Sequence, residues 1–183
     1  MSQKYFYNLR LGVTAFVSIA IWALLAWNYY HGGVPRHHFL AREDMPSVSN
    51  WWGGILLPML TWFLLYRIKK RMTDENSTQF PKSVVFAFVA ALLFGVLLSV
   101  FFTMRYSGLS GYMLQSVLVL SLFFPVYRAE YILGFVIGMT FTFGAVLPTI
   151  IGSVLALIGF LVYWLARKVV YQVRAFSDSN HPK

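Results

Sequence analysis

The chain has 183 residues, of which 58% are hydrophobic and only 11% are charged, and its formal net charge at pH 7 is +9. Soluble domains carry about 25% charged residues, and a soluble fold of this size could not bury so much apolar surface. These totals exclude an ordinary soluble domain and indicate one membrane domain over residues 1–183. The chain has no cysteine, which excludes disulfides, thiolate metal sites and cysteine nucleophiles.

The first apolar run covers residues 11–30 and predicts a membrane-spanning helix, because a helix that rises about 1.5 Å per residue crosses one hydrocarbon core in this length. The polar stretch 31–50 follows as a loop. A second helix is expected over 51–66, lengthened by basic side chains that reach the membrane interface. Aromatic side chains crowd the far end of the first run, as they do at a membrane surface: Trp22, Trp27, Tyr29 and Tyr30.

The long run 131–166 contains no charged residue. As a single helix it would be about 54 Å long, far more than one bilayer thickness. It must therefore break, and the best place lies between Gly144 and Pro148, since glycine frees the backbone and proline removes a donor. The sequence thus predicts an all-α bundle of six transmembrane helices, about 11–30, 51–66, 83–103, 110–127, 131–145 and 148–166, with a cytoplasmic tail over 167–183.

Small side chains share one face on three of these helices, which lets neighbouring backbones approach closely. We interpret these faces as internal packing surfaces. The same pattern also serves contacts between subunits, so a homo-oligomer remains the alternative. The residues are Ala87, Ala91, Gly95 and Ser99, then Gly134 and Gly138, and finally Gly152 and Ala156.

The distribution of basic residues orients the six helices. With the N-terminus inside, 12 of the 15 Lys and Arg residues lie in inner segments, and the outer segments hold only Arg36, Arg42 and Arg105. This bias follows the positive-inside rule. A topology with five helices would give almost equal numbers of basic residues on the two sides. We predict that both termini are cytoplasmic, that loop 31–50 is extracytoplasmic, and that a bacterial inner membrane supplies anionic lipids on the basic side.

The outer loop gathers side chains that can hold a metal ion. Imidazole and carboxylate suit zinc, copper or a similar divalent metal. The histidine spacing matches no established metal motif, so the alternative is a polar loop that contacts water and lipid headgroups. The candidate ligands are His31, His37, His38, Glu43 and Asp44.

A second set of residues at the outer face can bind a ligand or an anionic headgroup. The guanidinium fork of arginine matches phosphate geometry, and two adjacent tryptophan rings can stack on a ligand. The alternatives are unspecific interfacial charge and a helix cap with an aromatic belt. The candidates are Arg36, Arg42 and Arg105, with Asn50, Trp51 and Trp52 as a ligand-facing lip.

Glu130 is the one acidic residue that touches a membrane run, and ionisable groups there are functional candidates. Arg128 lies two residues away, so the alternative is an interfacial charge beside its counterion. No basic face with interleaved aromatic residues lies outside the apolar runs, and we expect no nucleic-acid partner.

Three classes of function fit the sequence. We favour an accessory or interaction protein whose loop 31–52 contacts a lipid headgroup or a membrane-protein partner, because such a role needs no catalytic constellation. The alternatives are a small membrane enzyme with a histidine and carboxylate metal site for a lipid-linked substrate, and a transporter or channel for a small solute. The catalytic patterns H-E-x-x-H and G-x-S-x-G do not occur.

Overall fold

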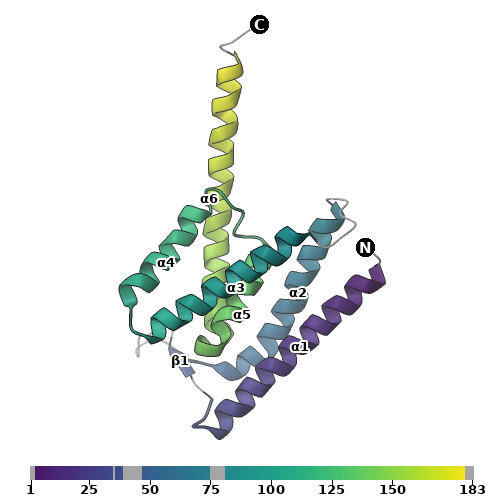
Figure 1. Ribbon diagram of the computed structural model, residues 1–183, viewed down its shortest axis with the longest axis vertical. Coiled ribbons are helices and arrows are strands. Elements are labelled where there is room, and N and C mark those ends of the chain that lie inside the picture. Colours follow the sequence, from purple (N-terminus) through teal and green to yellow (C-terminus); the bar gives the residue numbers. More distant parts are fainter. Residues whose placement is uncertain (1–2, 35, 39–46, 75–80, 180–183) are drawn as a thin grey trace.

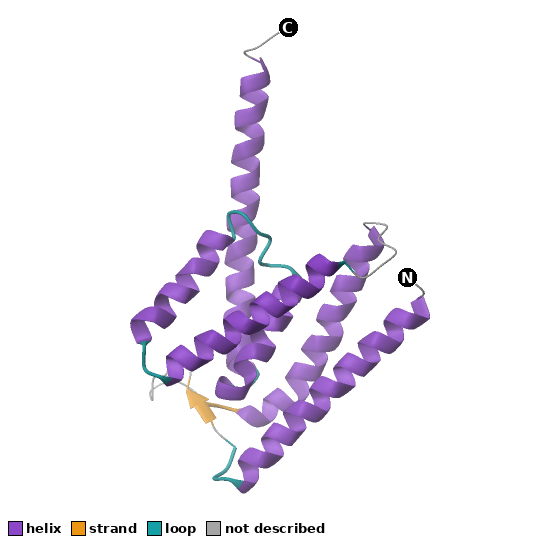
Figure 2. Cartoon of the chain, viewed as in Figure 1, coloured by secondary structure: helices purple, strands orange, loops and turns teal. Residues whose placement is uncertain are grey.

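The computed structural model describes residues 3–34, 36–38, 47–74 and 81–179. Within them the chain forms a bundle of α-helices with one short pair of strands (Figures 1 and 2), so the expectation of an all-helical bundle is confirmed. The helices are α1 (Gln3–Tyr30), α2 (Gly53–Asp74), α3 (Lys82–Thr103), α4 (Ser107–Leu120), α5 (Ala129–Phe143) and α6 (Val146–Ser179). The antiparallel strands β1 (Arg36–His38) and β2 (Ser47–Ser49) precede the short 3-10 turn η2 (Asn50–Trp52).

The chain runs back and forth between two ends of the bundle. In the view of Figure 1, the N-terminus, the end of α2, the connection from α4 to α5 and the C-terminal end of α6 lie toward the top. The strand β1 and the connections from α3 to α4 and from α5 to α6 lie toward the bottom. We call these the basic end and the hairpin end, since most Lys and Arg residues of the chain belong to the segments at the first.

Within the described parts of the chain, three helical segments are long and apolar enough to cross a membrane, namely Lys4–Tyr30, Lys82–Thr103 and Val146–Val173. The apolar helices α4 and α5 have 14 and 15 residues, which is short of the roughly 20 residues that a full span needs. Phe16, Phe86 and Phe141 are 73%, 77% and 80% exposed. Lipid accommodates such surface and water does not, which supports an integral membrane protein.

Three helices end away from the expected positions, each for a local reason. α2 continues to Asp74 rather than ending near residue 66, because residues 67–74 contain neither glycine nor proline. α4 stops at Leu120 rather than near residue 127, because the chain turns before Pro125, which has no N–H to continue a helix. Turn hydrogen bonds then form, such as that from the Phe124 N–H to the Leu120 carbonyl at 2.8 Å. α6 continues to Ser179 rather than ending near 166, since residues 167–179 contain neither glycine nor proline.

α5 is the central helix of the bundle and packs on α2, α3 and α6. A Cβ atom added at Gly134 or Gly138 would collide with the carbonyl oxygen of Phe88 or Leu92 on α3. Only glycine allows two helices to approach this closely. The small-residue faces of the third and fifth helices are therefore internal packing surfaces, as the sequence predicts.

Candidate functional site

A polar cavity of about 190 Å³ lies at the hairpin end, between α1, η2 and the end of α5. Its polar lining consists of amide and hydroxyl side chains, and the rest of its wall is mainly apolar. Such groups both donate and accept hydrogen bonds without carrying charge. The cavity can therefore hold a neutral hydrogen-bonding group. Its polar residues are Asn28, Asn50, Thr140 and Thr142.

The burial of Asn50 depends on a local cap and on a distant glycine. The Ser49 hydroxyl accepts a hydrogen bond from the Trp51 N–H at 3.4 Å and so begins the turn η2. Asn50 then lies against Gly144, with only 7% of its surface exposed. Gly144 has a φ of 69°, and a Cβ there would overlap the Asn50 amide. Backbone conformation and space both require glycine at this position.

The predicted lip of residues 50–52 divides into two parts. Asn50 faces the cavity, whereas Trp51 and Trp52 are exposed. The Trp51 ring lies 6.2 Å from that of Trp22 and 6.3 Å from that of Tyr29. These rings form an aromatic group at the end of α1, which suits the interface between lipid and water.

The predicted metal ligands fall mostly where the structure describes no side chain. The imidazole of His31 stacks on Trp27, with 3.9 Å between ring centroids, and its Nδ1 lies 2.9 Å from the Trp27 carbonyl oxygen. His37 and His38 belong to β1, and their side chains, like residues Glu43 and Asp44, are outside the described parts. Within the described parts no three His, Asp or Glu residues cluster, and the divalent-metal site remains a prediction.

The predicted anion-binding arginines are not brought together within the described residues. Arg36 pairs through its backbone with Ser49, and Arg42 lies outside the described residues. Arg105 is exposed in the turn between α3 and α4, where its φ is 62°. No described hydrogen bond links Arg105 to Asn50. The phosphate site proposed for this face from the sequence is therefore still a prediction.

A second candidate site lies at the basic end, and of its residues only Glu130 was a candidate from the sequence. The Arg71 Nη1 donates a hydrogen bond to Glu130 Oε2 at 3.0 Å, and Nη2 lies 3.0 Å from Oε1. The carboxylate is almost fully buried, whereas the arginine side chain is 24% exposed. Glu130 thus pairs with an arginine 59 residues away, and not with the neighbouring Arg128 as expected. In the sequence, the only indications of this pair were basic residues late in the second predicted helix and an acidic residue at the start of the fifth.

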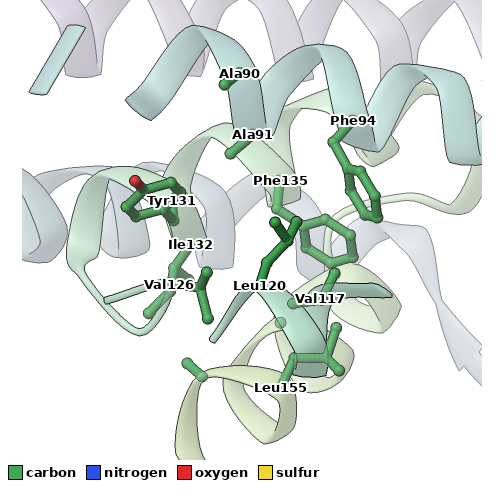
Figure 3. Close-up of a pocket in the computed structure, with 12 residues that line it drawn as sticks. Ala90, Ala91, Phe94, Val117, Leu120, Val126, Tyr131, Ile132, Phe135 and Leu155 are labelled. Atoms are coloured by element: carbon green, nitrogen blue, oxygen red, sulfur yellow. The ribbon is translucent and has the colours of Figure 1, made fainter. Parts of the chain in front are cut away.

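The ion pair borders a cavity of about 340 Å³ between α2 and the start of α5. Arg67, Arg71 and Arg128 line it together with Tyr127 and four apolar residues. A third cavity, of about 180 Å³, lies among α3, α4, α5 and α6 and has an almost wholly apolar wall (Figure 3). These three cavities, all lined by described residues, differ in character: the first is neutral and polar, the second is cationic and the third is apolar.

No family model, no curated protein and no solved structure matches the chain. Its function is therefore inferred from the geometry of these cavities.

Proposed function

We propose that the protein is a multi-pass accessory or interaction protein of a bacterial inner membrane, which binds a lipid headgroup or a membrane partner at its hairpin end. The supporting observation is the polar cavity beside residues 50–52, where Asn28, Asn50 and Thr142 provide neutral donors and acceptors. The Thr140 hydroxyl donates to the Val136 carbonyl oxygen at 2.7 Å and so provides an acceptor. Next to it, exposed Trp51 and Trp52 suit contact with the membrane surface. The ligand group that fits is uncharged and hydrogen-bonding, such as the glycerol or sugar part of a headgroup.

The proposed orientation puts six helices across the membrane with both termini in the cytoplasm. The alternation of helix ends in Figure 1 supports it, as does the concentration of Lys and Arg at the basic end. Loop 31–50 would then be periplasmic. The shortness of α4 and α5 is compatible with this arrangement, because residues 121–126 after α4 carry no charge and form local hydrogen bonds, as does Gly144 after α5.

A binding role fits this cavity better than catalysis. Amide and hydroxyl groups orient a ligand, whereas hydrolysis of a lipid-linked substrate needs a general base or a metal-bound water. The imidazole of His31, the one histidine side chain that the structure describes, is stacked on Trp27 and exposed at the end of α1. A zinc-dependent activity of the outer loop would overturn this preference.

The cysteine-free chain allows a clean test of orientation. Single cysteines at Tyr30 and Met104, which are 80% and 61% exposed at the hairpin end, should react in intact cells with a maleimide that cannot cross the membrane. Cysteines at Lys70 and Lys168, which are exposed at the basic end, should react only after permeabilisation. The opposite pattern, or equal labelling of all four, would refute the proposed topology.

A photo-crosslinking amino acid tests the binding role directly. Placed at Trp52, which is exposed beside the cavity, it should capture one lipid class or one membrane protein. The adduct should weaken when Thr142→Val removes a hydroxyl from the cavity. The control is the same probe at Phe86 on α3, which faces outward. If both positions give the same bulk-lipid adducts, the hairpin end has no specific ligand.

A further inference from the structure

The lining that α2 contributes to the cationic cavity changes along the helix from apolar to cationic. Phe63, Arg67 and Arg71 follow one another at intervals of four residues and all line the cavity. Residues so spaced lie on one face of a helix. This face is apolar toward the middle of the bundle and cationic toward its end, which is the order in which a membrane lipid presents its chains and its headgroup.

The charge of the cavity favours an anionic ligand. Three guanidinium groups line it, those of Arg67, Arg71 and Arg128. The Glu130 carboxylate balances one of them through its pair with Arg71, so three positive charges and one negative charge leave a net charge of +2. Guanidinium groups bind phosphate in a two-point geometry, and basic pockets between membrane helices bind anionic headgroups.

Two residues of the cavity wall, Arg71 and Tyr127, are positioned by contacts elsewhere in the fold. The ion pair with Glu130 holds Arg71 at the start of α5. The ring of Tyr127 packs on α6, with centroids 5.2 Å from Phe160 and 5.7 Å from Tyr163. A site whose side chains are already positioned loses less entropy when it binds a ligand.

The apolar cavity adjoins the cationic one through a shared residue. Ile132 lines both. The segment before it contributes Val126 to the apolar cavity and Tyr127 and Arg128 to the cationic cavity. In Figure 3 the side chains of Val126, Tyr131 and Ile132 lie at one side of the apolar cavity. Ile132 therefore lies between the two cavities, and a lipid with its phosphate in the cationic cavity would place a chain in the apolar cavity by passing this side chain.

We propose that an anionic phospholipid of the bilayer binds at this site, with its phosphate against Arg67, Arg71 and Arg128 and one acyl chain in the apolar cavity. The apolar residues Phe63 and Ile132 in the cavity wall favour a membrane lipid over a soluble phosphate compound. The site is separate from the polar cavity at the hairpin end, and it does not depend on which way the protein faces. Either proposal can fail without the other.

The test measures thermal unfolding of the purified full-length protein in detergent during titration with phosphatidylglycerol. Phosphatidylcholine with the same acyl chains is the charge control, and glycerol phosphate is the control for a headgroup without chains. The site variant is Arg67→Gln/Arg128→Gln, which leaves the pair of Arg71 and Glu130 in place. The matched control is Lys69→Gln/Lys70→Gln, which also removes two positive charges from the basic end but changes no residue that lines the cavity.

We expect phosphatidylglycerol to stabilise the wild-type protein at lower concentration than phosphatidylcholine. The site variant should raise the apparent Kd for phosphatidylglycerol about tenfold or more, the loss of roughly one charge-assisted contact, while the lysine variant should bind normally. If the glutamine variant does not fold, Arg67→Lys/Arg128→Lys keeps the charge, and its weaker binding would show that the guanidinium geometry matters.

Three results would overturn the proposal. Equal effects of the two lipids would exclude recognition of the phosphate charge. An equal loss in the arginine and lysine variants would indicate general attraction to a basic surface. Stabilisation by glycerol phosphate as strong as by the lipid would mean that the site takes a soluble phosphate compound.

The apolar cavity has its own variant. Ala156→Leu places a larger side chain at the cavity wall, and Ala166→Leu makes the same change on α6 outside it. The first variant should lose the preference for long-chain over short-chain phosphatidylglycerol, and the second should keep it. Unchanged chain-length preference in Ala156→Leu would refute the acyl-chain position.

Discussion

Arg71 and Glu130 join the end of α2 to the start of α5 through two contacts of 3.0 Å, although 59 residues separate them in the sequence. Each carboxylate oxygen meets a different guanidinium nitrogen, so the pair has the two-point geometry that makes arginine and carboxylate pairs strong. Leu64, Ile68 and Leu133 form an apolar cluster between the same two helices. Hydrophobic packing is not directional, so it holds α2 and α5 together without fixing their relative position. The ion pair adds a specific link that does.

Replacing Glu130 should destabilise the protein, because the arginine would be left partly buried without its counterion. We expect Glu130→Ala to lower the free energy of unfolding by about 2–4 kcal/mol, somewhat under the usual cost for a fully buried pair, since Arg71 keeps 24% exposure. Chemical unfolding in detergent measures this change. In a double-mutant cycle with Arg71→Ala the two losses should not add. Additive losses would show that the pair contributes no coupling.

Enlarging Gly138 should separate α3 from α5. A Cβ at this position would collide with the Leu92 carbonyl oxygen, and backbone cannot move aside as a side chain can. We predict that Gly138→Leu lowers the unfolding free energy by about 3 kcal/mol or more, measured in the same way. The control is Gly111→Ala on α4, where a Cβ meets nothing within 4 Å and should stabilise the helix by about 0.5–1 kcal/mol. An unchanged unfolding free energy in Gly138→Leu would contradict the close packing of α3 on α5.

Gly144→Ala should disturb the polar cavity as well as the backbone. The φ of 69° costs a residue with a Cβ about 1–2 kcal/mol, and the collision with the Asn50 amide adds to this. We expect a total near 3 kcal/mol, with the Trp51 fluorescence altered because η2 shifts. The control is Gly33→Ala, which has a φ of 95° but nothing within 4 Å. Equal effects of the two variants would mean that Asn50 does not occupy this space.

Arg10→Lys should weaken the contact between α1 and α2 while it keeps the charge. The Arg10 guanidinium lies 3.6 Å from the Trp62 ring centroid, and its Nε donates to the Trp62 carbonyl oxygen at 3.0 Å. Lysine cannot stack flat on the ring, so we expect a loss of about 1–2 kcal/mol in unfolding free energy. Arg167→Lys is the comparison, because its guanidinium is 5.4 Å from the Tyr163 ring. A similar, small loss of unfolding free energy at both positions would mean that the stack of Arg10 on Trp62 has no special role.

The sequence was a good guide to features that depend on local patterns. The charge-free run 131–166 divides at Gly144, where the φ of 69° needs glycine, and the spacing of Gly134 and Gly138 predicted a close helix contact. The prediction for α4 was wrong at its end, since the extension through Pro125 ignored that proline cannot continue a helix without loss of a hydrogen bond.

The candidate sites were harder to predict, because each is made by residues far apart in the chain. Asn50 was chosen with Trp51 and Trp52 as part of a ligand-facing lip, and its burial against Gly144, far along the chain, could not be read from the sequence. Glu130 was chosen as an acid at the membrane edge beside Arg128, yet Arg71 is its partner. The cavity lined by Arg67 and Arg128 was not predicted, since no pattern in the sequence indicates that α2 lies beside the start of α5.

By itself, the sequence determined that this is a helical protein with apolar segments suited to a membrane, because hydropathy and helix breaks are set by residues within a few turns of each other. The tertiary structure alone decided that α5 is central, which charges pair, and where polar and cationic cavities form. Those features arise when helices pack through specific side-chain and glycine contacts, such as Gly134 against Phe88. The energy of such contacts depends on three-dimensional proximity, which hydrophobic periodicity does not specify.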